Sequence, residues 1–185
     1  MKIVFASAVA ITLANPAYAQ TELEEGFIGA LRGCEEWILN PSGWSEGTER
    51  FVATVGLGAK MGLVANVDEV NLPPPELRRA NHYWRINSTP EAGYVLIVSD
   101  RLPMCHITAG GNSDFQPIAE TVLASDDFKA RWKMLKDVSR EEIASTQFQH
   151  REDRAFSIQI SRAKQPNERL DRVRIVATAT YTPND

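Results

Sequence analysis

The feature that most constrains the fold is the run Tyr-Val-Leu-Ile-Val at residues 94–98. Aromatic and β-branched residues favour a strand, and a strand without polar alternation must be covered on both faces. Residues 82–86 form a second strand pattern, and Pro90 and Gly93 supply turn residues between the two. These pieces predict a hairpin whose second strand lies inside a sheet.

Further strand patterns flank this hairpin. Residues 104–108 resume an apolar strand after a break at Pro103, and residues 142–148 alternate weakly. Residues 156–161 and 173–181 alternate strictly between apolar and polar side chains, which predicts neighbouring antiparallel strands with one face toward water. Residues 63–70 are expected to form a short strand or an irregular cover.

Apolar residues at three- and four-residue spacings predict an amphipathic helix over residues 21–39, ended by Pro41. Ser45 is expected to cap a second helix. Ser113 and Gln116 have the spacing of a capping box, which predicts another helix start. Ser125 is expected to cap a further helical segment that continues through residue 136.

The order of these elements predicts an α+β fold, with an antiparallel sheet of about five to six strands and helices packed mainly on one face. Residues 20–185 are predicted to form a single α+β domain, because a chain of this length suits one sizeable core.

Residues 1–19 have the pattern of a secretory signal peptide. An apolar run at residues 3–14 is followed by Pro16 and by the small-residue motif Ala17-Tyr18-Ala19, which predicts cleavage before Gln20. The apolar run is too short for a mature membrane span. The mature protein is therefore expected to be periplasmic or secreted, and not an integral membrane protein after signal cleavage.

The chain contains two cysteines, Cys34 and Cys105. Export to an oxidising compartment predicts that they form a disulfide. Closing a loop of this length would stabilise the fold by roughly 4 kcal/mol on the chain-entropy model. The alternative, a reactive thiol, usually needs a CxxC partner or an activating neighbour.

No residue pattern indicates a cofactor or a metal site. The three histidines, His82, His106 and His150, show no ligand spacing, so neither a metal nor a cofactor is predicted. With 20 basic and 24 acidic residues the formal net charge is −4, which argues against binding to nucleic acid. No residue pattern identifies catalytic residues, which are unknown from the sequence.

The least ordinary feature is the glycine-rich junction after the third strand. Gly110 and Gly111 precede Ser113 at the predicted helix start, where backbone N–H groups favour an anion. Gly110, Gly111, Ser113 and the nearby His106 are therefore candidate ligand-binding residues. The competing interpretation is that the glycines only allow the chain to turn.

These patterns favour an exported, non-catalytic binding or accessory module whose ligand is an unknown small molecule or partner protein. The first alternative is an exported hydrolase-type enzyme that uses Ser99, Asp100 and His106, which lie near one another in the sequence. The second alternative is a structural protein of the cell envelope.

Overall fold

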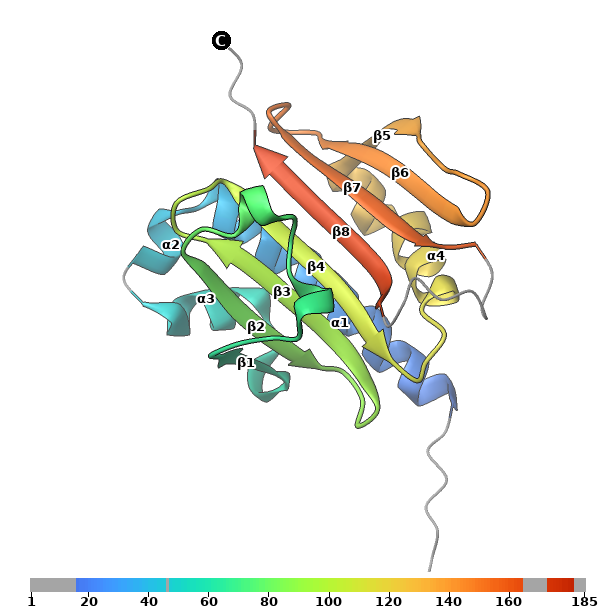
Figure 1. Ribbon diagram of the computed structural model, residues 1–185, viewed down its shortest axis with the longest axis horizontal. Coiled ribbons are helices and arrows are strands. Elements are labelled where there is room, and N and C mark those ends of the chain that lie inside the picture. Colours follow the sequence, from blue (N-terminus) through green and yellow to red (C-terminus); the bar gives the residue numbers. More distant parts are fainter. Residues whose placement is uncertain (1–15, 46, 165–172, 182–185) are drawn as a thin grey trace, which may run out of the picture.

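The computed structural model describes residues 16–45, 47–164 and 173–181. Over these residues the chain forms five α-helices and one antiparallel sheet of eight strands, in the order β1-β2-β3-β4-β8-β7-β6-β5 (Figure 1). The helices are α1 (Pro16–Leu39), α2 (Ser42–Ser45), α3 (Thr48–Val55), α4 (Gln116–Ala124) and α5 (Asp126–Arg131). The strands are β1 (Met61–Val64), β2 (Asn81–Asn87), β3 (Ala92–Ser99), β4 (Met104–Gly111), β5 (Trp132–Asp137), β6 (Ile143–His150), β7 (Phe156–Ala163) and β8 (Val173–Tyr181).

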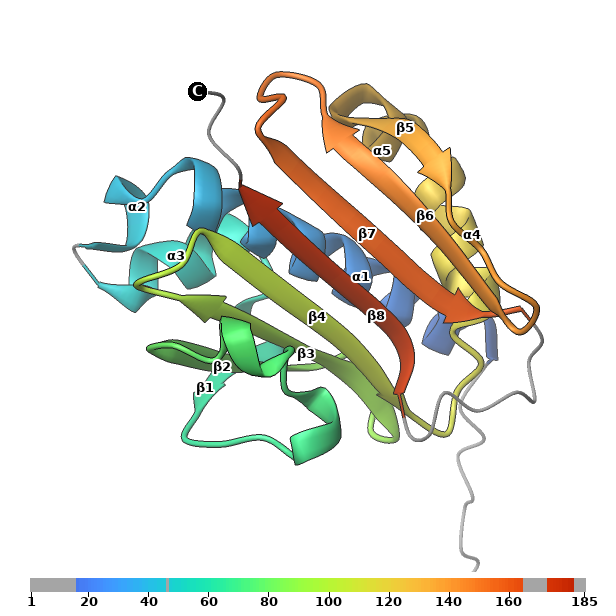
Figure 2. The same cartoon turned by 45° about the horizontal axis from the view of Figure 1, so that its top comes forward.

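The sheet consists of two sequential groups of strands joined by the last strand. The N-terminal half (β1–β4) and the C-terminal half (β5–β7) each run antiparallel in sequence order. Strand β8 pairs with β4 on one side and with β7 on the other. Figure 2 shows β8 lying between the two groups.

Helix α1 lies along the N-terminal half, against β3 and β4. Its apolar stripe is buried, including Phe27 and Leu31. Two glycines let it approach the sheet closely: a Cβ at Gly26 would stand 2.0 Å from Ser88 Oγ, and one at Gly33 would stand 2.8 Å from a methyl carbon of Leu96. Side chains larger than hydrogen would therefore push the helix away from the strands.

The predicted disulfide is confirmed. Cys34 on α1 and Cys105 on β4 are bonded, with their Cα atoms 5.5 Å apart, within the range that a disulfide requires. Both cysteines are fully buried. The bond fixes α1 to the sheet at the strand that borders β8.

The opposite face of the N-terminal half is covered by residues 65–80, which cross over β3 and β4 in Figure 1. The Thr108 hydroxyl donates a 2.7 Å hydrogen bond to Asn71 Oδ1 in this segment. Ile97 and His106, which point to the same side, are buried. The prediction that residues 94–98 are covered on both faces is confirmed.

The predicted fold class is wrong in the size of the sheet and in the arrangement of the helices. The described residues form eight strands rather than five to six. The helices do not pack as one face: α1 lies on the sheet, whereas α2 and α3 pack mainly on each other and on α1. Helix α5 contacts α4 and the edge strand β5.

The missed strand β5 is one source of the error in strand number; the other is β1 at residues 61–64, near the segment that was expected to be a short strand or an irregular cover. Ser125 does cap a helix, because its Oγ accepts a 3.2 Å hydrogen bond from the Phe128 N–H. That helix ends at Arg131, and the chain then pairs with β6. The register shifts between Met134 and Lys136, so Leu135 lies in an irregular step of the strand and is exposed. Phe128, Trp132 and Leu135 had helical spacing by coincidence.

Three helix starts also differ from expectation. Helix α3 has Gly47 at its N-cap, whereas Ser45, the predicted cap, is the last residue of α2. Helix α4 begins at Gln116 with Phe115 at its N-cap, and Asp114 rather than Ser113 bonds to the Gln116 N–H. Helix α1 begins at Pro16 and so extends across the predicted cleavage point before Gln20. Residues 1–15 of the predicted signal peptide lie outside the described residues. None of the described helices is long and apolar enough to cross a bilayer.

Candidate functional site

The hydrolase alternative required Ser99, Asp100 and His106 to meet. Instead, Asp100 Oδ2 lies 2.7 Å from Nε2 of His82 on β2. The Ser99 hydroxyl donates to the Arg79 carbonyl and accepts from two backbone N–H groups of the following turn. Ser99 therefore stabilises a turn, and the Asp100 carboxylate contacts His82 rather than His106.

His106 lies in the middle of the sheet. Its Nδ1 is 2.9 Å from the Thr178 hydroxyl on β8, and the side chain is buried. Burial disfavours the charged imidazolium and lowers the pKa of His106 from 6.5 to about 4. At neutral pH this histidine is an uncharged partner of Thr178.

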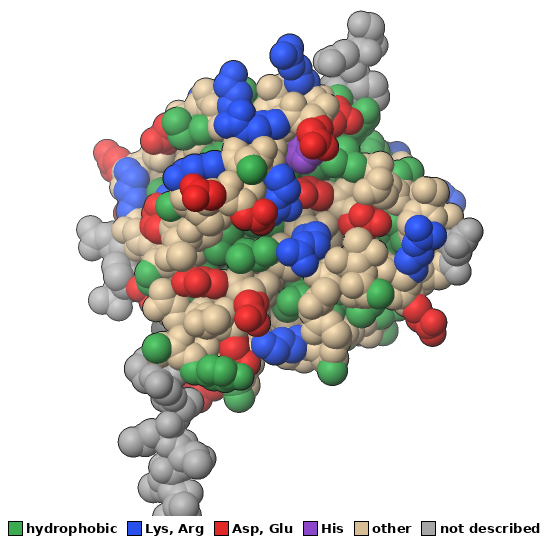
Figure 3. Space-filling model, turned by 180° about the vertical axis from the view of Figure 1, so that it is seen from behind, with side chains coloured by type: hydrophobic (Ala, Val, Ile, Leu, Met, Phe, Trp, Pro, Cys, Tyr) green, Lys and Arg blue, Asp and Glu red, His purple; other side chains and the backbone are tan. Residues whose placement is uncertain are grey.

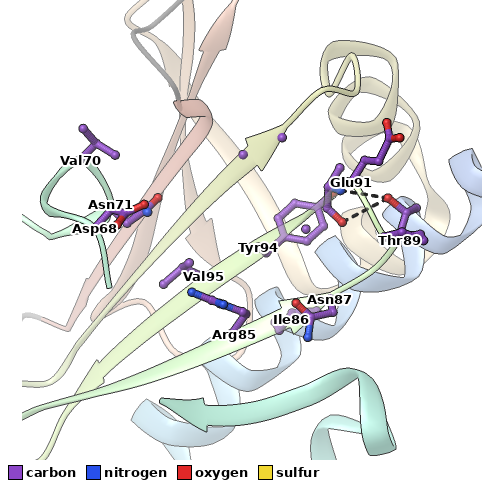
Figure 4. A pocket seen from close by; sticks show the side chains of 15 residues that line it. Asp68, Val70, Asn71, Arg85, Ile86, Asn87, Thr89, Glu91, Tyr94 and Val95 are labelled. Atoms are coloured by element: carbon purple, nitrogen blue, oxygen red, sulfur yellow. Dashed lines mark hydrogen bonds between the residues drawn. The ribbon is translucent and has the colours of Figure 1, made fainter. Parts of the chain in front are cut away.

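Gly110 and Gly111 do line a concave site, a hollow of about 360 Å³ that we call the hairpin pocket. Residues 68–71 form one wall, and the β2–β3 hairpin forms the other. Figure 4 shows Asp68 and Asn71 at one end of this pocket, Glu91 and Thr89 at the other, and Arg85 between them. Ser113 and His106 are not among its lining residues.

Two carboxylates beside one guanidinium give the hairpin pocket a mixed charge. Among the described residues, Asp68, Arg85 and Glu91 form no ion pairs. Gly111 has a structural reason to be glycine, since its φ is +121° and a Cβ would stand 2.3 Å from the Glu91 carbonyl oxygen. A ligand at Gly110 and Gly111 remains a prediction.

A larger hollow of about 440 Å³, which we call the helix-side pocket, lies between α4, α5 and strands β5–β7. Apolar side chains form much of its wall; they are Leu123, Ala124, Phe128, Trp132, Met134 and Phe148. Phe128, Trp132 and Phe148 are buried. The size and the mostly apolar lining are typical of small-molecule sites.

The helix-side pocket also has three cationic residues, Lys129, Arg151 and Arg162, and a single acidic residue, Glu120. Arg162 is buried, and its Nε donates a 2.8 Å hydrogen bond to Glu120 Oε1, to which Nη2 also donates. Its Nη1 has no hydrogen-bond partner among the described residues. Arg151 is held at the rim by a 2.7 Å bond from Nε to the Lys129 carbonyl.

Figure 3 shows the helix side of the molecule, where cationic and acidic side chains are interspersed and apolar atoms are exposed between them. The cations of the helix-side pocket are therefore not part of a larger positively charged surface on this side of the molecule. Glu120 pairs with Arg162, whereas Lys129 and Arg151 form no ion pair with the described residues.

No group of three or more histidine, cysteine, aspartate or glutamate side chains in the described ranges is placed to hold a metal ion. Comparisons of this chain with protein-family models, with curated proteins and with solved structures find no match.

Sequence reasoning missed the helix-side pocket, although one signal for it was present. Residues 156, 158 and 160 of β7 are apolar and buried, and Arg162 continues the same alternation. A cation at a core position of a strand indicates a partner or a ligand. The other cations could not have been associated with it, because they belong to α5 and to the β6–β7 turn.

Proposed function

We propose that this protein is an exported, non-catalytic binding module whose ligand is a small amphipathic anion held in the helix-side pocket. The observation behind the proposal is an apolar wall beside three cations, of which only Arg162 has a carboxylate partner among the described residues. An apolar ligand body would be stabilised by burial against Phe128 and Phe148. An anionic head would be attracted by Lys129 and Arg151.

Arg162 adds a more specific requirement. A buried guanidinium N–H without an acceptor is unfavourable by about 1–3 kcal/mol or more, because it has lost water without gaining a partner. A carboxylate or sulfonate oxygen bound near Nη1 would supply that acceptor. This favours an anion over a neutral apolar ligand of the same shape.

The alternatives have less support. The hydrolase alternative has little support because its three residues bond elsewhere: Ser99 and Asp100 have other partners, and His106 bonds to Thr178. A purely structural envelope protein has no need for a cationic, partly apolar hollow. Export is supported by the Cys34–Cys105 disulfide, since such bonds persist mainly in oxidising compartments.

The first test compares octanoate with 1-octanol, which share an apolar chain and differ in the charged head. Calorimetric titration of the purified protein should show octanoate binding at least about tenfold more tightly, since a charge-assisted hydrogen bond is worth about 1.5–3 kcal/mol. Equal affinities would show that the cations do not contribute to binding. If neither probe bound, the proposal would be contradicted.

Two neighbouring residues of β5 give a matched test of the location. Met134 lines the helix-side pocket and Leu135 does not, yet both side chains are well exposed, at 62% and 45%. Met134→Glu should abolish octanoate binding by placing a like charge at the site, whereas Leu135→Glu should leave it unchanged. Lys129→Gln should weaken binding about tenfold, with Lys133→Gln as its control. Equal effects within either pair would place the ligand elsewhere.

Export has its own test. Intact-mass measurement of protein recovered from the periplasm or medium should give a chain that begins at Gln20. A mass that still includes residues 1–19 would contradict the predicted cleavage without affecting the binding proposal.

A further inference from the structure

A second concave site lies on the other face of the C-terminal half. We call this hollow of about 340 Å³ the open-face pocket; its polar lining residues are Lys136, Arg140, Ser145, Gln159 and Ser161. Val138 and Ile143 complete the lining. Residues 65–80, which cover this face of β3 and β4, do not line it.

The strand register brings these polar residues together. Ser145 on β6 is paired with Ser161 on β7, while Gln159 is paired with Gln147, which is itself paired with Lys136. Partners in a register point to the same face. The turn between β5 and β6 adds Arg140, whose N–H donates a 2.8 Å bond to the Ile143 carbonyl.

Two serine hydroxyls form the floor of the open-face pocket. Ser145 Oγ and Ser161 Oγ are 2.8 Å apart, and Ser145 is only 5% exposed. Each hydroxyl has one hydrogen to donate. Their mutual bond uses one of these hydrogens, and the other has no acceptor among the described residues. The lining of the pocket therefore contains a hydroxyl hydrogen without an acceptor, together with two cations.

The lining of this pocket includes no carboxylate. The adjacent Asp137 is engaged in a turn, where its Oδ1 accepts a 2.8 Å hydrogen bond from the Ser139 N–H. Lys136 and Arg140 form no ion pair with any described residue. Two positive charges thus line one small polar hollow, and neither is ion-paired with a described carboxylate.

We infer that the open-face pocket binds a phosphate group, either as inorganic phosphate or as the terminal group of a small phosphate ester. Lys136, Arg140, the serine pair and the Gln159 amide offer donors from more than one side. A tetrahedral oxyanion presents its oxygens in several directions. A carboxylate has only two oxygens, and both lie in one plane. A dianion also matches two cations better than a monoanion does.

The experiment titrates the protein with inorganic phosphate, glycerol 3-phosphate and acetate at low ionic strength, followed by NMR shifts of backbone amides in β5–β7. Phosphate or its ester should bind at least about tenfold more tightly than acetate, and added salt should weaken the binding. Comparing the two phosphates identifies the source of the group. Equal weak binding of all three ligands would overturn the inference.

Matched variants locate the site. Lys136→Gln and Arg140→Gln should each reduce phosphate affinity about tenfold, since each removes a charge-assisted bond. Lys133→Gln lies on the same strand but does not line the pocket, so it should have no effect. Ser161→Ala should weaken binding, with Ser157→Ala on the same strand and face as control.

If Lys136→Gln and Lys133→Gln change phosphate affinity equally, phosphate does not bind in the open-face pocket. The outcome is independent of the helix-side pocket, because Lys129→Gln should alter octanoate binding and leave phosphate binding unchanged.

Discussion

The two halves of this sheet share one hydrogen-bonded ladder but are covered differently. Strands β3 and β4 in the N-terminal half lie between α1, which is fixed by the disulfide, and residues 65–80. In the part of the chain that the structure describes, helices α4 and α5 contact the C-terminal half from one side. On its other side Gln159 is exposed, and Ser157 and Ser161 are half-buried.

Both halves contain buried polar atoms without a hydrogen-bond partner among the described residues: Trp84 Nε1 and Ser88 Oγ in the N-terminal half, and Arg162 Nη1 in the C-terminal half. Buried polar side chains of β4 are paired, His106 with Thr178 and Thr108 with Asn71. In the C-terminal half, Lys136 and Arg140 form no ion pair with described residues, and Arg162 has an unpartnered nitrogen. Satisfied buried groups stabilise a fold, whereas unsatisfied ones at a hollow suit ligands. Because β3 and β4 are covered on both sides, we expect stability to depend mainly on the first half, and we propose that the hollows of the second half bind ligands.

The largest effect should come from the disulfide. Cys34→Ala should lower the free energy of unfolding by about 4 kcal/mol, because the unfolded chain is no longer constrained by a loop of this length. Urea unfolding of the variant and of wild type, with and without reductant, measures this. If the variant lost less than about 1 kcal/mol, the covered half would not depend on its link to α1.

The next effect should come from the cover formed by residues 65–80. Ile97 is fully buried on that side, and Ile97→Ala should be destabilising by about 3 kcal/mol through lost burial and a residual cavity. The free energy of unfolding in urea tests it. A loss below about 0.5 kcal/mol would mean that this cover contributes little to stability.

A smaller effect should appear with pH. The pKa of His106 is lowered to about 4 in the folded protein by burial. Below its ordinary value near 6.5 the unfolded chain takes up a proton first, so stability is present above that pH and is lost as the pH falls toward 4. Lowering the pH from about 7.5 to about 5 should remove about 2 kcal/mol through this group.

The matched variant for the pH effect is His106→Gln, which keeps a hydrogen-bonding side chain next to Thr178 but does not titrate. Its unfolding free energy should depend less on pH than that of wild type. Identical pH dependence in the two proteins would show that His106 is not the group responsible.

The smallest effect should come from the open face. Gln159→Ala on β7 should change the free energy of unfolding by less than about 0.5 kcal/mol, because the side chain is exposed. If Gln159→Ala lowered the free energy of unfolding as much as Ile97→Ala, the two halves would not differ in their contribution to stability.

The sequence predicted the N-terminal half of the sheet better than the C-terminal half. Residues 94–98 had no polar alternation, which required cover on both faces, and the two cysteines allowed only one intramolecular pairing. Strand β5 could not be recognised, because Phe128, Trp132 and Leu135 fit a helix and only pairing with β6 decides otherwise. Local periodicity does not contain such tertiary information.

The candidate sites were less accessible to sequence reasoning. Gly110 and Gly111 were recognisable as glycines at a junction, and they line the hairpin pocket. The cations of the helix-side pocket come from α5, the β6–β7 turn and β7. Residues so far apart become neighbours only through the fold, and none of them belongs to a short motif.

The position of β8 has a consequence for how the chain folds. It is the last of the described strands, and within the described part of the sheet it alone joins β4 to β7. Until β8 has emerged and docked, each half has an open strand edge, the kind of surface on which chains aggregate. Its pairing with β4 is also a contact of large sequence separation, which slows folding. Strand β8 must therefore be synthesised before the sheet can close, and a chain truncated before Val173 would lack the strand that joins the two groups.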